Sequence, residues 1–469
     1  MINIVPLKTL RKILLLSFAL STQILSEPWT NWGHNQQCSP CRIWNPESLG
    51  QVQEIIKQAS QLKIPIRFVG SAHSWSDLVC TDGYLITTDQ FNKILNIDTD
   101  KLQVTVQGGI KLKDLFEKLA QEGFALSNQG FIKEQSIAGA ISTATHGTGK
   151  HGTLSDLVIG VQLVDASGKI HTIDNNNNPE WLPAARVHLG ALGFIYSVTL
   201  QCEPLFMLNH IREIKRYQEV IPYYRQLYHD HDYFMVMLHP TKDVALTFTW
   251  DRTHKPLTKN FLVHLPEDIV MSYTINYLGI RSLCQFPTIG SVCLENTLYA
   301  LQKKEHREYS YLSLSPLNSP VSVNCYIEEE FAIPFDYFEQ ALSSIKELYQ
   351  QYESYGIMLA GLITCRFGPG LTLAYLDPAY GRKTAYITVN ILNFFDQYEQ
   401  FFQDLEKTIS PFHGRPHWGK FHHLSYADIY RLYGDNAQSF NNIRLTLDPN
   451  GVFANNFIKR CFEANPAHQ

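Results

Sequence analysis

One segment of fourteen residues restricts the fold more than any other part of the chain. Residues 136–149 carry no charge, and apart from His146 they contain no side chain larger than isoleucine. Such a segment has too little apolar surface to form a core by itself. Its small residues instead allow the backbone to approach a flat or phosphorylated ligand closely. We expect either a nucleotide-contact segment or a tightly packed turn of Gly and Ala residues.

Length and charge exclude several classes of protein. The chain has 469 residues, which corresponds to two to four domains at roughly 100–200 residues each. Its formal net charge is −5, whereas nucleic-acid binders need an excess of Lys and Arg to contact phosphates. We therefore predict no nucleic-acid partner. The apolar content of 45% excludes a mostly disordered chain.

The amino terminus is predicted to be a targeting segment. Lys8, Arg11 and Lys12 precede an uncharged apolar run over residues 13–25. This run has the length of a signal-peptide core and is short for a membrane span, which needs roughly 20 residues. Residues 1–26 are thus expected to be a cleaved signal peptide or an uncleaved membrane anchor, with an ordinary buried helix as the third alternative. The protein is expected to be exported, periplasmic or secreted, or membrane-anchored.

Export permits disulfide bonds, so the cysteines need attention. The chain has nine, and the odd number leaves at least one thiol without an intrachain partner. Cys38 and Cys41 form a C-x-x-C motif, but no thioredoxin-like pattern surrounds it. A single pair of thiols cannot make a four-thiolate zinc site. We expect a local disulfide or two inert thiols.

The pattern of helices and strands predicts an α+β protein with two closely packed domains. Residues 45–204 alternate between helical and strand-like segments. From about residue 205 this alternation gives way to strand-like runs and a hydrophobic, Tyr-rich stretch. Helices are expected at residues 48–62, 112–123, 335–352 and 395–409. Strands are expected at residues 64–69, 83–86, 103–107, 158–164, 170–173, 194–202, 233–238, 244–250, 357–367 and 385–392.

Three further features carry polar chemistry. Residues 69–74 form a turn of small residues after a strand, which suits backbone contacts with an anion. Residues 414–420 cluster Arg, His, Trp and Lys between glycines, as an anion site or a solvated loop would. His413 and His417 lie four residues apart, but Pro416 prevents the helix that would place both on one metal, so no metal site is predicted. Arg366 lies in an apolar strand, where an unpaired charge is costly.

Together these segments resemble the flavin-dependent aldonolactone oxidases, the gulonolactone and arabinonolactone oxidases of the vanillyl-alcohol-oxidase superfamily. The strongest blocks are residues 70–77, 80–83, 126–128, 136–149, 185–193, 197–204, 415–420 and 447–451. The resemblance runs from Asn31 to about Phe457. It implies a two-lobed, PCMH-type FAD-binding domain over residues 35–205 and a substrate domain over residues 206–469, whose last segment returns to the FAD.

The resemblance also implies roles for individual residues. His73 matches the histidine that attaches covalently to the flavin, although Ala72 replaces the usual glycine before it. Residues that match cofactor contacts are Gly70, Ser71, Ala72, His73, Ser74, Ser136, Gly139, Thr145, His146, Gly147 and Ile195. Arg366 and Lys420 match cationic catalytic residues, and Ser136, Asn390 and His417 are expected to line the substrate site.

The chain departs from this family at one catalytic position. The family has Glu two residues before the arginine, whereas this chain has Thr364-Cys365-Arg366. A threonine cannot act as a carboxylate base. The substitution weakens the expectation of normal turnover, or it indicates a different substrate. Cys365 adjoins Arg366 and the altered position.

Gly130 matches a position where glycine accompanies oxygen-reactive members of the family. The resemblance therefore implies an oxidase that acts on a CH–OH group of a sugar lactone or polyol and reduces oxygen to hydrogen peroxide. One alternative is a dehydrogenase with a quinone or cytochrome as acceptor. Another is a flavin-binding protein that has lost catalysis because Glu is absent at position 364.

Overall fold

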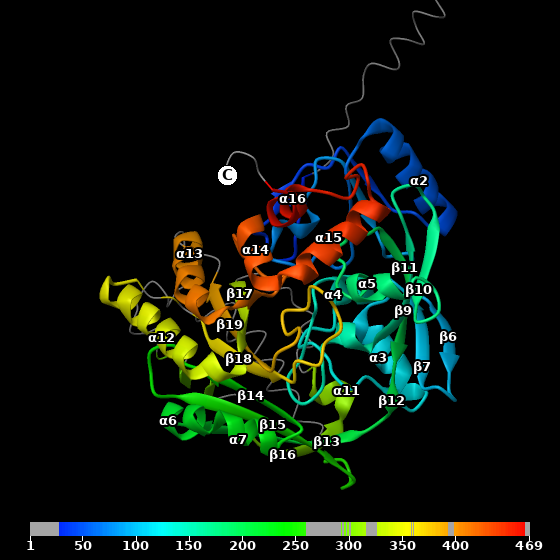
Figure 1. Cartoon of the computed structure of the whole chain (residues 1–469). Coiled ribbons are helices and arrows are strands. Elements are labelled where there is room, and N and C mark those ends of the chain that lie inside the picture. Colours follow the sequence, from blue (N-terminus) through cyan, green and yellow to red (C-terminus); the bar gives the residue numbers. More distant parts are fainter. Residues whose placement is uncertain are drawn as a thin grey trace, which may run out of the picture.

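The computed structural model describes residues 28–258, 292, 295–296, 298–299, 302–315, 326–357, 359, 361–392 and 398–464 (Figure 1). The first sheet is parallel, has three strands in the order β3-β5-β4, and is crossed by helix α2. Helix α2 is capped by Ser48, whose side chain accepts the Gln51 N–H. The bounds are β3 (Arg42–Trp44), α2 (Leu49–Leu62), β4 (Ile66–Val69) and β5 (Tyr84–Thr87).

A second, antiparallel sheet of five strands lies beside the first. Its order is β10-β9-β11-β7-β6. Helices α3, α4 and α5 pack against it through an apolar cluster that includes Leu115, Ile141 and Val198. The bounds are β6 (Ile94–Asp98), β7 (Gln103–Gln107), α3 (Leu112–Gln121), α4 (Ile137–Ser142), β9 (Val158–Val164), β10 (Ile170–Asp174), α5 (Leu182–Ala185) and β11 (Phe194–Gln201).

The second half of the chain forms an antiparallel sheet of eight strands. Its order is β16-β13-β15-β14-β18-β19-β17-β20. The bounds are β13 (Met207–Lys215), β14 (Tyr233–Leu238), β15 (Ala245–Thr253), β16 (Lys303–Tyr309), β17 (Tyr326–Pro334), β18 (Ile363–Gly368), β19 (Thr384–Leu392) and β20 (Arg415–Pro416).

Helices cover one face of this large sheet. Alternate residues of β18, namely Ile363, Cys365 and Phe367, pack under these helices. Because side chains alternate across a strand, Thr364 and Arg366 point to the opposite face. Cys365 is therefore a core residue with no exposed surface and does not face the site, contrary to what its position beside Arg366 indicated. The helices are α6 (Tyr217–Val220), α7 (Tyr224–Asp230), α12 (Phe338–Ser354) and α13 (Tyr398–Ile409).

The C-terminal segment packs against the elements of the N-terminal half (Figure 1, orange to red). Phe440 and Phe457 join the cluster of the five-stranded sheet, and Val452 and Phe453 join the cluster under α2. The helices are α14 (Tyr426–Tyr433), α15 (Asp435–Leu447) and α16 (Asn456–Phe462). Residues distant in sequence are thereby brought to the same lobe.

The predicted α+β class is confirmed, and most periodic segments form the expected helices and strands. The strand predicted over residues 357–367 begins only at Ile363, as β18. The hairpin of β9 and β10 pairs Ile170 with Val164, as its turn predicted. Helix α4 was not expected, because Gly139 and Ser142 are poor helix formers, although Ala138 and Ala140 favour a helix. Residues 1–26 lie outside the described residues. Among the described residues, no helix combines the length and apolar character that crossing a membrane requires.

Candidate functional site

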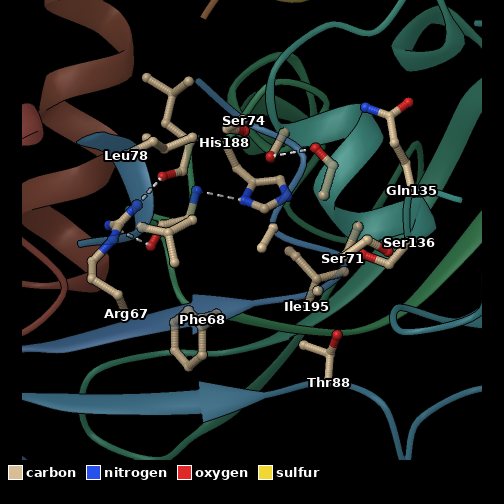
Figure 2. Close-up of a pocket in the computed structure, with 18 of the residues that line it drawn as sticks. Arg67, Phe68, Ser71, Ser74, Leu78, Thr88, Gln135, Ser136, His188 and Ile195 are labelled. Atoms are coloured by element: carbon tan, nitrogen blue, oxygen red, sulfur yellow. Dashed lines mark hydrogen bonds between the residues drawn. The ribbon is translucent and has the colours of Figure 1, made fainter. Parts of the chain in front are cut away.

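A pocket lies between the end of β4, helix α4 and the start of β11 (Figure 2). Figure 2 shows Ser71, Ser136 and Ile195 together at one side of this pocket. Eight of the predicted cofactor residues line it, and they come from three separate parts of the chain: Gly70, Ser71, Ala72, His73, Ser74, Ser136, Gly139 and Ile195. Their individual roles stay predictions.

The loop at residues 70–74 has a tightly defined backbone. Ala72 adopts a left-handed conformation with φ of 57°, a region that favours glycine. The loop thus accommodates the Ala72 methyl group, which replaces the glycine that the resemblance implies, at the cost of local backbone strain. The Ala72 carbonyl accepts a hydrogen bond from Trp32 N–H at 2.9 Å. On the far side of the loop, Lys111 Nζ donates to Ser71 Oγ at 2.8 Å.

His73 presents a free ring nitrogen to this pocket. Its Nδ1 is buried and has no hydrogen-bond partner among the described residues. Burial, together with the cationic Lys420 and Lys111, lowers the pKa of His73 to about 4. The ring is therefore neutral at pH 7, and a neutral imidazole nitrogen is a nucleophile. Trp32 stacks on the ring with centroids 4.8 Å apart. An uncharged, partnerless nitrogen fits a histidine that bonds to a flavin.

Arg67 is a site residue that could not be predicted from the sequence, and its side chain is buried, with 1% of the residue exposed. Its guanidinium donates to the carbonyl oxygens of Leu189 at 2.7 Å, Gly190 at 3.2 Å and Phe453 at 2.7 Å. Arg67 lines the pocket (Figure 2), and its hydrogen bond to the Phe453 carbonyl joins the pocket wall to the C-terminal segment. No local pattern marks such a residue, since an arginine in a strand resembles an exposed edge residue.

A second polar cluster is centred on Glu330, which has no exposed surface. Its carboxylate accepts from Arg366 Nη2 at 2.5 Å, from the Thr388 hydroxyl, and lies 2.6 Å from His146 Nε2. Burial opposes the charge, but Arg366 and His146 outweigh that effect and hold the pKa of Glu330 well below its usual value. His146 Nδ1 lies 2.9 Å from the Gly147 carbonyl. Burial lowers the pKa of His146, although the Glu330 carboxylate opposes that effect.

The structure divides the small-residue segment between the pocket and this cluster. Ser136 and Gly139 line the pocket, whereas the His146 side chain faces Glu330. The backbone carbonyl of His146 accepts a hydrogen bond from Arg366 Nη1 at 3.2 Å. Thr145 and Gly147 are not among the residues that line the pocket. The segment therefore connects the pocket to the large sheet.

Lys420, which is predicted to be catalytic, reaches the face of the sheet that carries Glu330, and Asn390, which is predicted to line the substrate site, lies on that face. Lys420 Nζ forms a close ion pair with Glu328 and lies 4.2 Å from the centroid of the Trp75 ring. Asn390 is the register partner of Glu328, and its Nδ2 donates to the Leu362 carbonyl at 3.4 Å. Because residues 328 and 330 alternate with 329 along β17, both carboxylates point the same way.

His417 lies close to His146, with ring centroids 5.6 Å apart. Burial lowers the pKa of His417 to about 3, so the ring is neutral at pH 7. His146, Glu330 and His417 place potential metal ligands within 4.8 Å of one another. Arg366 and Thr388 already bond to the Glu330 carboxylate, however, so the group is built as an ion-pair network.

Thr364, at the position where the resemblance implies Glu, pairs across the sheet with Thr388. The Thr388 hydroxyl donates to Glu330, so a carboxylate lies one strand away from the altered position. Sequence reasoning missed Glu328 and Glu330. The signal was present, since three consecutive Glu residues in an apolar strand must place two of them on one face.

Two family models match this chain. Residues 40–174 match an FAD binding domain, and residues 198–461 match D-arabinono-1,4-lactone oxidase. The second match covers more than half of the chain. The chain belongs to the D-arabinono-1,4-lactone oxidase family. As a member of this family it uses FAD as its cofactor, and the neutral His73 and the small-residue walls of the pocket fit that group.

Named relatives agree with this assignment, and a solved structure shares the fold. L-gulono-1,4-lactone dehydrogenase of Mycobacterium tuberculosis is 32% identical over 93% of this chain and 99% of the relative. L-gulonolactone oxidase of Mus musculus is 29% identical over 92% of this chain and 97% of the relative. A solvent-stable cholesterol oxidase has the same fold, with a TM-score of 0.75 at 17% identity over 93% of this chain and 97% of that one.

Proposed function

We propose that this D-arabinono-1,4-lactone oxidase family member oxidises a CH–OH group of a sugar lactone and passes the electrons to oxygen. The observation that carries the proposal is a family match over residues 198–461, in which two cations, Arg366 and Lys420, lie on one face of the sheet. FAD, when bound, accepts a hydride from the substrate carbon and reduces oxygen to hydrogen peroxide.

The chain's own residues supply orientation and charge. Glu330 holds the Arg366 guanidinium in place, and Glu328 does the same for Lys420. Loss of the hydroxyl proton develops negative charge on the substrate oxygen, which these cations stabilise. Thr364 contributes a hydroxyl and no carboxylate, so it orients a substrate hydroxyl by hydrogen bonding and takes no proton.

We propose that oxygen is the electron acceptor, because Gly130 stands where the resemblance places glycine in oxygen-reactive members, although the Thr145 methyl group fills the space beside it. A Cβ atom at position 130 would lie 2.6 Å from Thr145 Cγ2, so an alanine would have to displace that side chain. The alternative is a dehydrogenase that uses a quinone or cytochrome as acceptor. It is worth testing because the Mycobacterium tuberculosis relative is named a dehydrogenase. Rapid reoxidation in air supports the oxidase; a reduced flavin that stays colourless for minutes and is reoxidised by a quinone supports the dehydrogenase.

Anaerobic bleaching tests the substrate class. The purified holoenzyme is mixed with D-arabinono-1,4-lactone, L-gulono-1,4-lactone or a polyol, and absorbance of the flavin is followed. We expect bleaching by a lactone and recovery with hydrogen peroxide formation when oxygen is admitted. Flavin colour without bleaching by any of them would contradict the proposal and favour a binding protein that has lost catalysis.

Two variants separate the contributing residues. His73→Ala is expected to bind flavin that acid precipitation releases, whereas the unaltered chain keeps its colour in the precipitate. Thr364→Glu restores the carboxylate of the related enzymes. If it leaves the rate of bleaching unchanged, the missing carboxylate does not limit turnover.

We also propose that residues 1–26 direct export or anchor the protein to a membrane. The positive charges at Lys8, Arg11 and Lys12 before an apolar run support this assignment. Mass spectrometry of the amino terminus, together with fractionation of the producing cell, distinguishes cleavage from anchoring.

A further inference from the structure

We propose that Cys38 and Cys80 form a disulfide bond that fastens an N-terminal hairpin onto the loop that carries His73. Cys38 ends the second strand of the hairpin formed by β1 (Trp29–Thr30) and β2 (Gln37–Cys38). Cys80 follows the short helix η1 (Asp77–Val79). Each of the two thiols alters the pKa of the other and both line one cavity, so the two sulfur atoms lie near each other.

The hairpin covers His73. The Trp32 ring stacks on the imidazole, and the Trp32 N–H donates to the Ala72 carbonyl at 2.9 Å. Asn31 Nδ2 donates to the Ser74 carbonyl at 2.8 Å. Hydrogen bonds and the contacts of the Trp32 ring with His73, Trp75 and Tyr326 hold this small element. A covalent link at its base would restrict its opening further.

The two cysteines differ in ways that suit sequential oxidation. Both are half-buried, and both line a cavity of about 910 Å³ through which a small oxidant can approach. The hydrogen bond from Cys80, with another from the Thr81 backbone, lowers the pKa of Cys38. The same pairing and burial raise the pKa of Cys80. Cys38 is therefore the better thiolate, and Cys80 is the thiol that resolves it.

Hydrogen peroxide is the oxidant, so the step rests on the proposed oxidase function for its natural supply. The Cys38 thiolate attacks one peroxide oxygen, the O–O bond breaks, and the departing hydroxide takes a proton to become water. The Cys80 sulfur then attacks the sulfur of the Cys38 sulfenic acid. The S–O bond breaks, and the hydroxide leaves as water with the Cys80 proton. In sum, two thiols and one peroxide give a disulfide and two waters.

Cys41 is the competing partner, because it completes the C-x-x-C motif with Cys38. Cys41 is exposed, and its N–H donates to the Asp82 carbonyl at 2.9 Å as the chain enters β3. The hydrogen-bonded partner of Cys38 is instead Cys80, which is distant in sequence. Cys41→Ser is therefore a matched control for Cys38→Ser.

Peptide mapping under non-reducing conditions tests the link in the full-length holoenzyme. One sample turns over substrate in air, a second does so with catalase, and a third receives hydrogen peroxide alone after reduction. We expect a Cys38–Cys80 peptide in the first and third samples of the unaltered chain and of Cys41→Ser, and none in Cys38→Ser. Deuterium exchange over residues 29–38 should be slower in the oxidised protein than in the reduced one.

The three samples separate this proposal from the proposed function. A Cys38–Cys80 link that appears only with added peroxide supports the disulfide and counts against the oxidase. A Cys38–Cys41 link, or no link after added peroxide, would overturn the disulfide. Equal exchange over residues 29–38 in the oxidised and reduced proteins would overturn its fastening role.

Discussion

Glu330 shows how much of this site depends on a single side chain. Its carboxylate joins Arg366 of β18, Thr388 of β19 and His146 of the small-residue segment. Removing one member of a buried ion pair leaves an uncompensated charge, which costs far more than losing a surface pair. The position of the Arg366 guanidinium therefore depends on Glu330.

Glu330→Gln is expected to lower the free energy of unfolding by about 3–5 kcal/mol and to abolish or greatly reduce substrate oxidation. The amide keeps the size of the side chain but leaves the Arg366 charge unpaired. Chemical denaturation and anaerobic bleaching measure the two effects.

Glu54→Gln is the control for this prediction. Glu54 pairs with Lys57 at 3.5 Å on the surface of α2, where its side chain is 77% exposed. Exposed ion pairs contribute little to the free energy of unfolding. Glu54→Gln should therefore leave that free energy and the rate of flavin bleaching unchanged. Equal stability of Glu330→Gln and the unaltered chain would contradict the role assigned to Glu330.

Among the elements, helix α16 binds the C-terminal segment to the loop that follows His73. Asn455 caps the helix by accepting the Ile458 N–H at 3.1 Å. Its Nδ2 also donates to the carbonyls of Asp77 at 3.1 Å, Leu78 at 3.1 Å and Cys80 at 2.9 Å. One side chain thus satisfies a helix terminus and the backbone of η1, at the wall of the flavin pocket.

Asn455→Ala is expected to lower the free energy of unfolding by about 2–3 kcal/mol, since it removes a cap and leaves buried carbonyls without donors. It should also weaken retention of any flavin that is not covalently bound. Ser425→Ala is the matched comparison, because Ser425 caps α14 through the Asp428 N–H and has no such second role. That change should cost about 1 kcal/mol and leave flavin binding intact.

Several elements could be predicted and others could not. The strand at residues 103–107 was predicted with its observed bounds, because alternating Val and polar residues leave little choice of conformation. The helix predicted from residue 395 has described residues only from Tyr398. Two-residue strands such as β12 (Glu203–Pro204) carry no periodicity, and only pairing with β8 (Phe124–Ala125) defines them.

Across the whole molecule, burial of uncharged histidines makes stability depend on pH. Burial lowers the pKa values of both His188 and His417 to about 3. The unfolded chain takes up these protons near pH 6.5, well before the folded protein does. The free energy of unfolding therefore falls as the pH is lowered from about 6.5 towards 3.

Each of these two histidines is expected to contribute up to about 1.4 kcal/mol per pH unit to that decline. Thermal melts between pH 7.5 and 4.5 measure it. His188→Gln should make the curve shallower, whereas His229→Gln should not, because the His229 side chain is 87% exposed. A melting temperature that stays constant over this range would contradict the prediction.

The sequence alone determined the fold class, the FAD cofactor and the family, because each depends on short segments with strong local preferences. Residues 70–74 and 136–149 need small side chains wherever they fold, and apolar periodicity defines the long helices and strands. Tertiary structure alone decided that Glu330 holds Arg366, that Cys365 is core and that Cys38 meets Cys80. Strand register and loop packing set these contacts between distant residues, and no local pattern encodes either.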